Sequence, residues 1–299
     1  MRLESFDLPP PGLGQVLVHV KAASVNPIDW KVRNGAMKHL AGRGLPRGMG
    51  RDFSGVVTAV GEGVTRSKPG DAVVGMLDWR DTSGSFADAV VIDERLVALK
   101  PPTLSHEIAA CLPTVGTAAW CSLFKFGVDR RRGKAIFVNG CMGGVGRATV
   151  QLANSAGVRV DGSCSGDALD DAVRLGVEQP VDYASENLSE YHGLYDAVLD
   201  TSCTMTFRRA QPLFRSGGGV FLDLEPTRKK ALAGLVNRRH KLVVVRPTSN
   251  VLSYLLNVAS MGVLNPSISR TVSLGDAILA IADLERSPHG KGKVVITMA

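Results

Sequence analysis

A run of glycines at residues 140–146 is the part of the sequence whose composition and spacing most directly indicate chemistry. Residues 135–148 read AIFVNGCMGGVGRA, so the glycines follow an apolar segment and precede an amphipathic one. In a dinucleotide-binding fold, such glycines let the backbone turn sharply and approach the pyrophosphate, and the free N–H groups of the next helix bind it. The loop therefore predicts a dinucleotide site. The alternative is a glycine-rich turn that holds no nucleotide.

The type of dinucleotide depends on the end of the next strand. An NAD site places an acid there, about 20 residues after the glycine loop, to bind the ribose hydroxyls. Here the residues at the end of the strand, 163–165, are small and neutral, which favours a 2′-phosphate and hence NADPH. NADH is the alternative, because Asp167 lies nearby. The residues expected to contact the cofactor are Gly140, Cys141, Met142, Gly143, Gly144, Val145, Gly146, Ser163, Cys164 and Ser165.

The segments around the glycine loop alternate between apolar strand-like runs and amphipathic helix-like runs. This alternation predicts an α/β fold with a doubly wound parallel sheet of the Rossmann type. The expected strands are 135–138, 158–162, 197–199, 219–224 and 242–245, and the expected helices are 145–156, 168–175 and 206–214.

The first hundred residues have a different pattern, with short apolar runs separated by Gly- and Pro-containing turns. Many short strands at this spacing predict a compact β-rich domain. An apolar strand at 293–297 is expected to return to that domain and make it discontinuous. The expected boundaries are 1–111 with 262–299 for the substrate domain and 112–261 for the dinucleotide-binding domain.

Charge and cysteine usage restrict the function classes. The formal charge is +7, but the basic residues are scattered, so a nucleic acid is not expected as a partner. Two basic clusters, at 130–134 and 228–241, are interpreted as solvated faces. The alternative is that they attract an anionic partner. The five cysteines contain no Cys-x-x-Cys pair, which indicates reduced thiols and no zinc cage.

No stretch approaches the ~18 to 20 uninterrupted apolar residues of a membrane span. The N-terminal segment also lacks the apolar core of a secretory signal. The sequence therefore predicts a cytoplasmic protein that does not associate with a membrane.

Several motifs in sequence order resemble the zinc-independent quinone oxidoreductase and alkenal/enone reductase branch (zeta-crystallin-like) of the medium-chain dehydrogenase/reductase superfamily. The resemblance covers nearly the whole chain and implies a GroES-like substrate domain, a Rossmann domain and a homodimer. It also adds Tyr183, which matches a position near the 2′-phosphate, to the expected cofactor residues. The matching segments are VLVHVKAASVNPIDWK at 16–31, GRDFSGVVTAVG at 50–61, PGDAVVG at 69–75, LPTVGTAAW at 112–120, VNGCMGGVG at 138–146, DY at 182–183 and GKVV at 292–295.

The same resemblance implies that no zinc is bound. Zinc alcohol dehydrogenases of this superfamily carry a Cys ahead of the position matching Asp29 and open the core signature with Gly-His-Glu. This sequence has Asn26 and Gly50-Arg51-Asp52 there. A catalytic zinc needs about three N, S or O ligands, and two obvious candidates have been replaced.

The expected reaction is hydride addition to the β-carbon of a conjugated carbonyl, which needs a positioned nicotinamide and a donor near the enolate oxygen. Lys31 is the candidate donor or ribose anchor, or else an exposed lysine. Asn26 is expected to orient substrate or cofactor, or else to form a turn before Pro27. Thr114 is expected beside the nicotinamide, or else as a helix cap. Trp30 and Trp79 line the pocket or belong to the core.

Three hypotheses about function remain open at this point. The first is a reductase of free enones or quinones. The second is an enoyl or tailoring reductase that acts on a substrate tethered to an acidic acyl carrier protein, which the basic clusters would bind. The third is a non-catalytic nucleotide-binding protein, as the crystallin members of the branch imply. Carrier dependence predicts rates that fall steeply with salt.

Overall fold

The computed structural model describes residues 1–37, 47–131, 134–185, 187–225, 227, 234, 237–287 and 292–298. The chain forms two compact units, Met1–Thr117 with Arg246–Ala299, and Ala118–Val245. The first unit is discontinuous, with the C-terminal segment returning to the N-terminal one. Segments 112–117 and 246–261 belong to the first unit, whereas the sequence placed them with the dinucleotide-binding domain.

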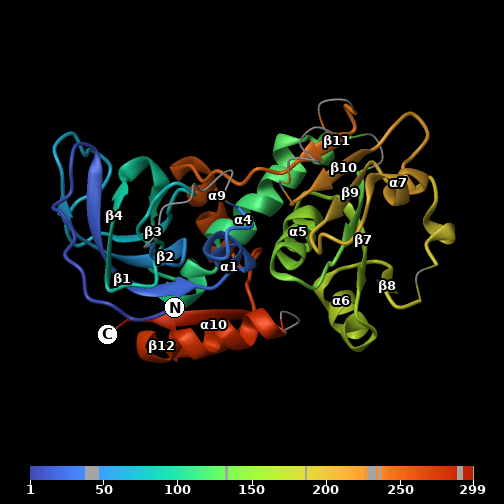
Figure 1. Cartoon of the computed structure of the whole chain (residues 1–299). Helices are drawn as coiled ribbons and strands as arrows, with labels where there is room; N and C mark the ends of the chain where they lie inside the picture. The colour runs from blue at the N-terminus through green and yellow to red at the C-terminus, as the bar shows by residue number, and fades with distance from the viewer. Residues whose placement is uncertain are drawn as a thin grey trace. The chain divides into compact units, whose positions relative to one another are not determined.

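The first unit is built on a mostly antiparallel sheet in the order β12-β13-β1-β2-β3-β5, with β4 also paired to β1 (Figure 1). The C-terminal strand β13 pairs antiparallel with β1, so the expected closing strand does complete the N-terminal sheet. The strands are β1 Gln15–Ser24, β2 Asp52–Val60, β3 Ala72–Met76, β4 Ala89–Asp93, β5 Val97–Leu99, β12 Ile268–Ser273 and β13 Lys293–Thr297.

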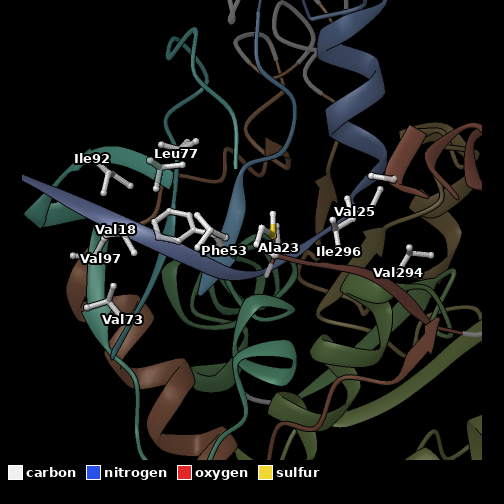
Figure 2. Close-up of a cluster of buried hydrophobic side chains, with 14 of the residues drawn as sticks. Val18, Ala23, Val25, Phe53, Val73, Leu77, Ile92, Val97, Val294 and Ile296 are labelled. Atoms are coloured by element: carbon white, nitrogen blue, oxygen red, sulfur yellow. The ribbon is translucent and has the colours of Figure 1, made fainter. Parts of the chain in front are cut away.

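The core of this unit follows from the alternation of residues along its strands. In β1 every second residue is fully buried over most of its length, because successive side chains of a strand point to opposite faces. Figure 2 shows the side chains of β1, β2 and β13 that form the cluster, among them Val18, Phe53 and Ile296. Burying a side chain of this size contributes about 1.5–3 kcal/mol.

Helices and short turns connect the strands of the first unit. Helix α1 (Pro27–Arg33) begins where Asn26 caps it and Pro27 fixes the first turn, and Asp29 completes a capping box. The others are α3 His106–Ala110, α4 Pro113–Trp120, which runs past the end of the unit at Thr117, α9 Ser249–Ser260 and α10 Ala277–Arg286. None of the helices in the described part of the chain is long and apolar enough to cross a membrane.

The second unit contains a parallel sheet in the order β11-β10-β9-β6-β7-β8 (Figure 1). Strand β6 pairs with β7 on one side and β9 on the other, so the chain reverses its direction of winding between β6 and β9. Ligands bind at such a switch point in α/β sheets. The elements are β6 Ala135–Asn139, α5 Gly144–Ser155, β7 Arg159–Cys164, α6 Leu169–Leu175, β8 Pro180–Asp182, β9 Ala197–Asp200, α7 Phe207–Ala210, β10 Val220–Asp223 and β11 His240–Leu242.

Two elements of this unit differ from the sequence prediction. The expected helix 206–214 is a four-residue α-helix, α7, followed by a 3₁₀ turn at Gln211–Leu213, because Pro212 has no N–H to continue the α-helix. The expected strand 242–245 lies earlier, as β11. It ends at Leu242 because its partner β10 ends at Asp223.

Candidate active site

The glycine loop leaves the carboxyl end of β6 at the switch point. Gly140 has φ of 86°, a conformation that residues with a Cβ rarely adopt. The amides of Gly140 and Cys141 both donate to the carbonyl of Ser163, at 3.0 and 2.9 Å. These bonds tie the start of the loop to the end of β7 and fix the point at which α5 begins.

The turn into α5 requires a second glycine. A Cβ on Gly146 would lie 2.2 Å from the carbonyl oxygen of Gly140, closer than any real contact. Gly143 caps the helix and Gly144 begins it, and both are exposed, so free N–H groups of the first turn are accessible. This arrangement fits a pyrophosphate, because helix N-termini bind anions through these groups and the helix dipole.

Arg147 lies against the glycine loop and is not among the cofactor residues that the sequence interpretation expected. Its Nε donates to the carbonyl of Met142 at 3.0 Å, so the guanidinium lies against the glycine loop. The helix dipole disfavours a cation in the first turn. A cation at this place is instead suited to binding an anion. The signal was available in the sequence, since Arg147 directly follows the last glycine of the loop.

A buried polar network lies at the carboxyl ends of β6 and β9. The Asn139 amide donates to Asp200 Oδ1 at 2.8 Å and to the hydroxyls of Ser202 and Thr204 at 2.7 and 3.0 Å. Its Oδ1 accepts from the Ser163 hydroxyl at 2.6 Å. The network fixes the loop after β9, and it was not predicted because these residues are distant in sequence.

The tip of β7 uses its polar groups internally. Asp161 is fully buried and accepts from the Tyr195 hydroxyl at 2.6 Å, from Arg159 at 2.5 Å and from the Gln179 amide at 3.1 Å. Asp161 is therefore a structural residue inside β7. The Ser163 hydroxyl is also engaged, with Asn139, although Ser163 was expected to contact the cofactor.

Cys141 and Cys164 are buried free thiols, and the Cys141 side chain packs against Gly162. The pKa of Cys141 is raised because its thiol donates to Cys164 and because it is buried. The pKa of Cys164 is lowered by the same interaction with Cys141. Two expected cofactor residues thus pack beneath the glycine loop, with Cys141 fully buried and Cys164 4% exposed.

A second polar cluster lies in the first unit and joins segments that are far apart in sequence. The Asn26 amide donates to Asp52 Oδ2 at 3.0 Å, and Lys293 Nζ donates to Asn26 Oδ1 at 2.5 Å and to the Val25 carbonyl at 2.9 Å. Thr114 donates to Asp52 twice, through its hydroxyl at 2.7 Å and its backbone amide at 3.1 Å. The structure therefore brings two of the expected catalytic residues, Asn26 and Thr114, onto one buried carboxylate.

Asp29 adds a second buried carboxylate to this cluster. Its Oδ2 accepts from the backbone N–H of Asn26 at 2.7 Å, whereas its buried Oδ1 has no hydrogen-bond partner in the described part of the chain. The pKa of Asp29 is raised to about 7, chiefly because the carboxyl is buried. The pKa of Asp52 is also raised by burial, while Lys293 and the bonds from Thr114 and Asn26 act against that rise.

Arg51 occupies the signature position where the zinc dehydrogenases carry histidine. Its side chain is 2% exposed, and Nη1 donates to the carbonyls of Asp78 and Asp81 at 2.6 and 3.3 Å. Burial lowers the pKa of the guanidinium, and Asp29, Asp81 and Asp78 oppose that effect. Arg51 thus ties the loop after β3 to the start of β2.

The remaining expected site residues lie outside the cluster. Lys31 is half-buried on α1, and its ammonium has no hydrogen bond or ion pair with the described residues. Trp30 is 8% exposed and belongs to the core of the first unit. Trp79 is half-buried in the loop held by Arg51. Tyr183, at the end of the second unit's β8, is 58% exposed.

Asp52 and Lys293 are the central residues of the cluster that the sequence interpretation did not assign to the site. Asp52 lies in the core signature at 50–61 and Lys293 in the terminal Gly-Lys-Val-Val, and both segments match the resembling family. The sequence therefore contained a signal for both residues. Nothing in the sequence indicates that residues 26, 52, 114 and 293 meet, because this contact depends on the pairing of β13 and β2 with β1.

The donor set does not fit a catalytic zinc. The guanidinium of Arg51 cannot act as a metal ligand, and the Asn26 amide is occupied by Asp52 and Lys293. Within the described residues, no group of three or more His, Cys, Asp and Glu side chains is arranged to hold a metal ion.

Comparison with known proteins identifies the family. Residues 12–102 match the alcohol dehydrogenase GroES-like domain, and residues 175–296 match a family described as zinc-binding dehydrogenase. The chain is 30% identical to a chloroplastic quinone oxidoreductase of Triphysaria versicolor, over 97% of this chain and 91% of that one. It is 33% identical to a 2-methylene-furan-3-one reductase of Solanum lycopersicum, over 94% and 71%.

Solved structures show the same fold. A quinone oxidoreductase from Coxiella burnetii has a TM-score of 0.87 at 29% identity, with 98% of this chain and 94% of that chain covered. An Escherichia coli quinone oxidoreductase complexed with NADPH has a TM-score of 0.81 at 22% identity, with 98% and 94% covered. The two units are thus the GroES-like and Rossmann-like domains that the sequence predicted, and the chain belongs to the quinone oxidoreductase branch of the medium-chain dehydrogenase/reductase superfamily.

Proposed function

We propose that the protein is an NAD(P)H-dependent reductase that adds hydride to the C=C bond of an α,β-unsaturated carbonyl or to a quinone. The observation that carries this proposal is the glycine loop at the switch point, whose exposed helix N-terminus fits a dinucleotide pyrophosphate. Relatives named quinone oxidoreductase and 2-methylene-furan-3-one reductase support the two substrate classes.

The second unit would hold the cofactor through the first turn of α5 and through Arg147. When bound, the reduced nicotinamide supplies the hydride. The chain's own part is then to position the dinucleotide: Gly140 and Gly146 shape the loop, and Asn139 holds the neighbouring loop after β9.

The first unit would act on the carbonyl. Lys31 remains the proposed donor to the developing oxyanion, because its ammonium has no partner among the described residues. Asn26 and Thr114 are proposed to act as positioning residues through Asp52. Because Asn26 and Arg51 cannot serve as zinc ligands here, we propose that turnover needs no zinc.

Three further expectations remain predictions. Binding of an acidic carrier protein rests on the basic clusters, of which Arg132, Arg228, Lys229 and Lys230 lie outside the described residues. The homodimer rests on the resemblance, and the cytoplasmic location remains a prediction from the sequence. Some relatives are named chloroplastic and others mitochondrial, so fluorescence microscopy of the tagged protein is the test of the location.

The test is the initial rate of NADH and NADPH oxidation with 2-alkenals, cyclic enones and quinones, with EDTA present throughout. We expect turnover that survives the chelator. We also expect the Lys31→Met variant to lose most of kcat while its melting temperature is unchanged. Dinucleotide binding without turnover of any free substrate would overturn the proposal and favour the carrier-tethered or non-catalytic alternatives. A rate that vanishes with EDTA and returns with zinc would overturn the metal-independent reaction.

A further inference from the structure

The part of the second unit that follows the glycine loop is unusually acidic. Residues 159–185, from β7 through β8, contain two basic and six acidic side chains, in a chain whose net charge is +7. Both basic residues are paired: Arg159 with Asp161 and Glu178, and Arg174 with Asp171. This segment therefore has no unpaired cation to offer a phosphate.

One carboxylate of this segment projects toward the tip of β7. Asp182 ends β8 and is paired in register with Cys164, the last residue of β7. Its Oδ2 lies 2.8 Å from the point where a Cβ on Gly166 would be, so the missing side chain of Gly166 leaves room for the carboxylate. Its Oδ1 accepts from the Ala184 amide at 2.9 Å, and Oδ2 has no hydrogen-bond partner among the described residues.

A second carboxylate is near the same tip. Asp167 is exposed in the turn that follows β7. Asp182 and Asp167 both act electrostatically on the Cys164 thiol, against the stronger effect of Cys141 on its pKa. The hydroxyl of Ser163, which could have bound a phosphate, is already engaged with Asn139. The end of β7 is therefore neutral in sequence but negative in its surroundings.

We propose that Asp182 substitutes for the acid that is missing at the end of β7, and that the protein prefers NADH to NADPH. This inference rests on the proposed function, because it assigns the adenosine end of the same cofactor site. A carboxylate accepts hydrogen bonds from ribose hydroxyls, as the acid after the second strand does in NAD sites. A 2′-phosphate carries roughly two negative charges, and it would place them close to the carboxylates of Asp182 and Asp167. The neutral tip predicted NADPH, so this preference is the reverse of the sequence expectation.

The experiment measures dissociation constants of the full chain for NADH and NADPH by fluorescence titration. The same titration with 5′-AMP and 2′,5′-ADP as competitors examines the adenosine end alone. We expect NADH to bind at least about 10-fold more tightly than NADPH, and AMP more tightly than 2′,5′-ADP, since like charges in contact disfavour binding. The preference for NADH over NADPH should shrink as salt rises, because salt screens the repulsion of the 2′-phosphate, which only NADPH carries.

Asp182→Asn removes the charge and keeps an oxygen to accept from Ala184, so the turn after β8 is retained. We expect this variant to bind NADH about 10-fold more weakly and to lose the preference for it. Asp170→Asn, which removes the charge of an exposed carboxylate in the same segment, should keep the preference. Equal or tighter binding of NADPH by the unaltered protein would overturn the inference alone. Binding of neither dinucleotide would overturn the proposed function with it. An unchanged preference in a folded Asp182→Asn protein would remove Asp182 from the assignment.

Discussion

The two units build their polar sites in different ways. In the second unit the glycine loop is made from consecutive residues, and its shape is set by backbone conformation at Gly140 and by a close approach at Gly146. In the first unit, Asn26, Asp52 and Lys293 come from three distant segments and meet through side-chain hydrogen bonds. The site in the second unit therefore depends on which residues fit the backbone conformation. The cluster in the first unit depends on which charged groups folding buries next to one another.

This difference predicts where each site is vulnerable. Changes in volume should damage the glycine loop, because backbone atoms there leave no space. Changes in charge should damage the first-unit cluster, because a buried ion that loses its partner has no water to replace it. The following variants test that contrast.

The largest expected effect is that of Lys293→Met. It leaves Asp52 buried without its nearby cation and removes the bonds to Asn26 and Val25, which should lower the free energy of unfolding by about 3–5 kcal/mol. Chemical denaturation measures this change. Lys68→Met, the same substitution at an exposed position, should stay within about 0.5 kcal/mol. The Lys293→Met/Asp52→Asn double variant should recover part of the loss, and a double variant as unstable as the sum of both single changes would show that the two groups are not coupled.

Asp29 gives the next effect, which appears as a dependence on pH. Its carboxyl is faced by Asp52, Lys293 and Arg51, and its pKa is raised in the folded protein from 3.8 to about 7. The stability it contributes is therefore full below about pH 4 and is lost as pH rises through 7, by at most on the order of 4 kcal/mol. Between about pH 4 and pH 7, the free energy of unfolding of the unaltered protein should fall relative to that of Asp29→Asn. Above this range, the difference between the two proteins should stay constant. Exposed Asp7→Asn should show no such slope, and a flat difference for Asp29→Asn would mean that Asp29 is ionised throughout.

A smaller loss of stability, with a large loss of binding, is expected for Gly146→Ala. Its Cβ would meet the Gly140 carbonyl oxygen at 2.2 Å, so the loop must move, at a cost of about 1–3 kcal/mol. Gly143→Ala is the matched control, since its Cβ would lie 3.5 Å from the same oxygen, an ordinary contact. Thermal unfolding should separate the two variants, and NADH titration should show the loss of binding in Gly146→Ala. Equal behaviour would contradict the role assigned to the close approach.

The smallest effect is that of Tyr195→Phe. It removes the 2.6 Å bond to the buried Asp161 and should cost about 1–2 kcal/mol. Cofactor preference should not change, because Asp161 is a structural residue within β7 and not a ribose ligand. An altered ratio of NADH to NADPH affinity in this variant would show that Asp161 takes part in cofactor selection after all.

Much of the fold was readable from the sequence because it rests on local patterns. The alternating strands of the first unit, the strand–loop–helix at 135–156 and the returning strand at 293–297 were all predicted and confirmed. The predictions that were wrong, a full helix at 206–214 and a strand at 242–245, depended on where a proline interrupts hydrogen bonding and where a neighbouring strand ends.

The sequence by itself determined the glycine loop and the family, because residue type and order are enough to specify a turn that only glycine tolerates. The tertiary structure decided the rest. It brought Asp52 and Lys293 to Asn26, and it placed Asp182 beside the neutral tip of β7. Both outcomes depend on strand pairing between distant segments, and the charge that surrounds a residue in space is not the charge of its neighbours in sequence.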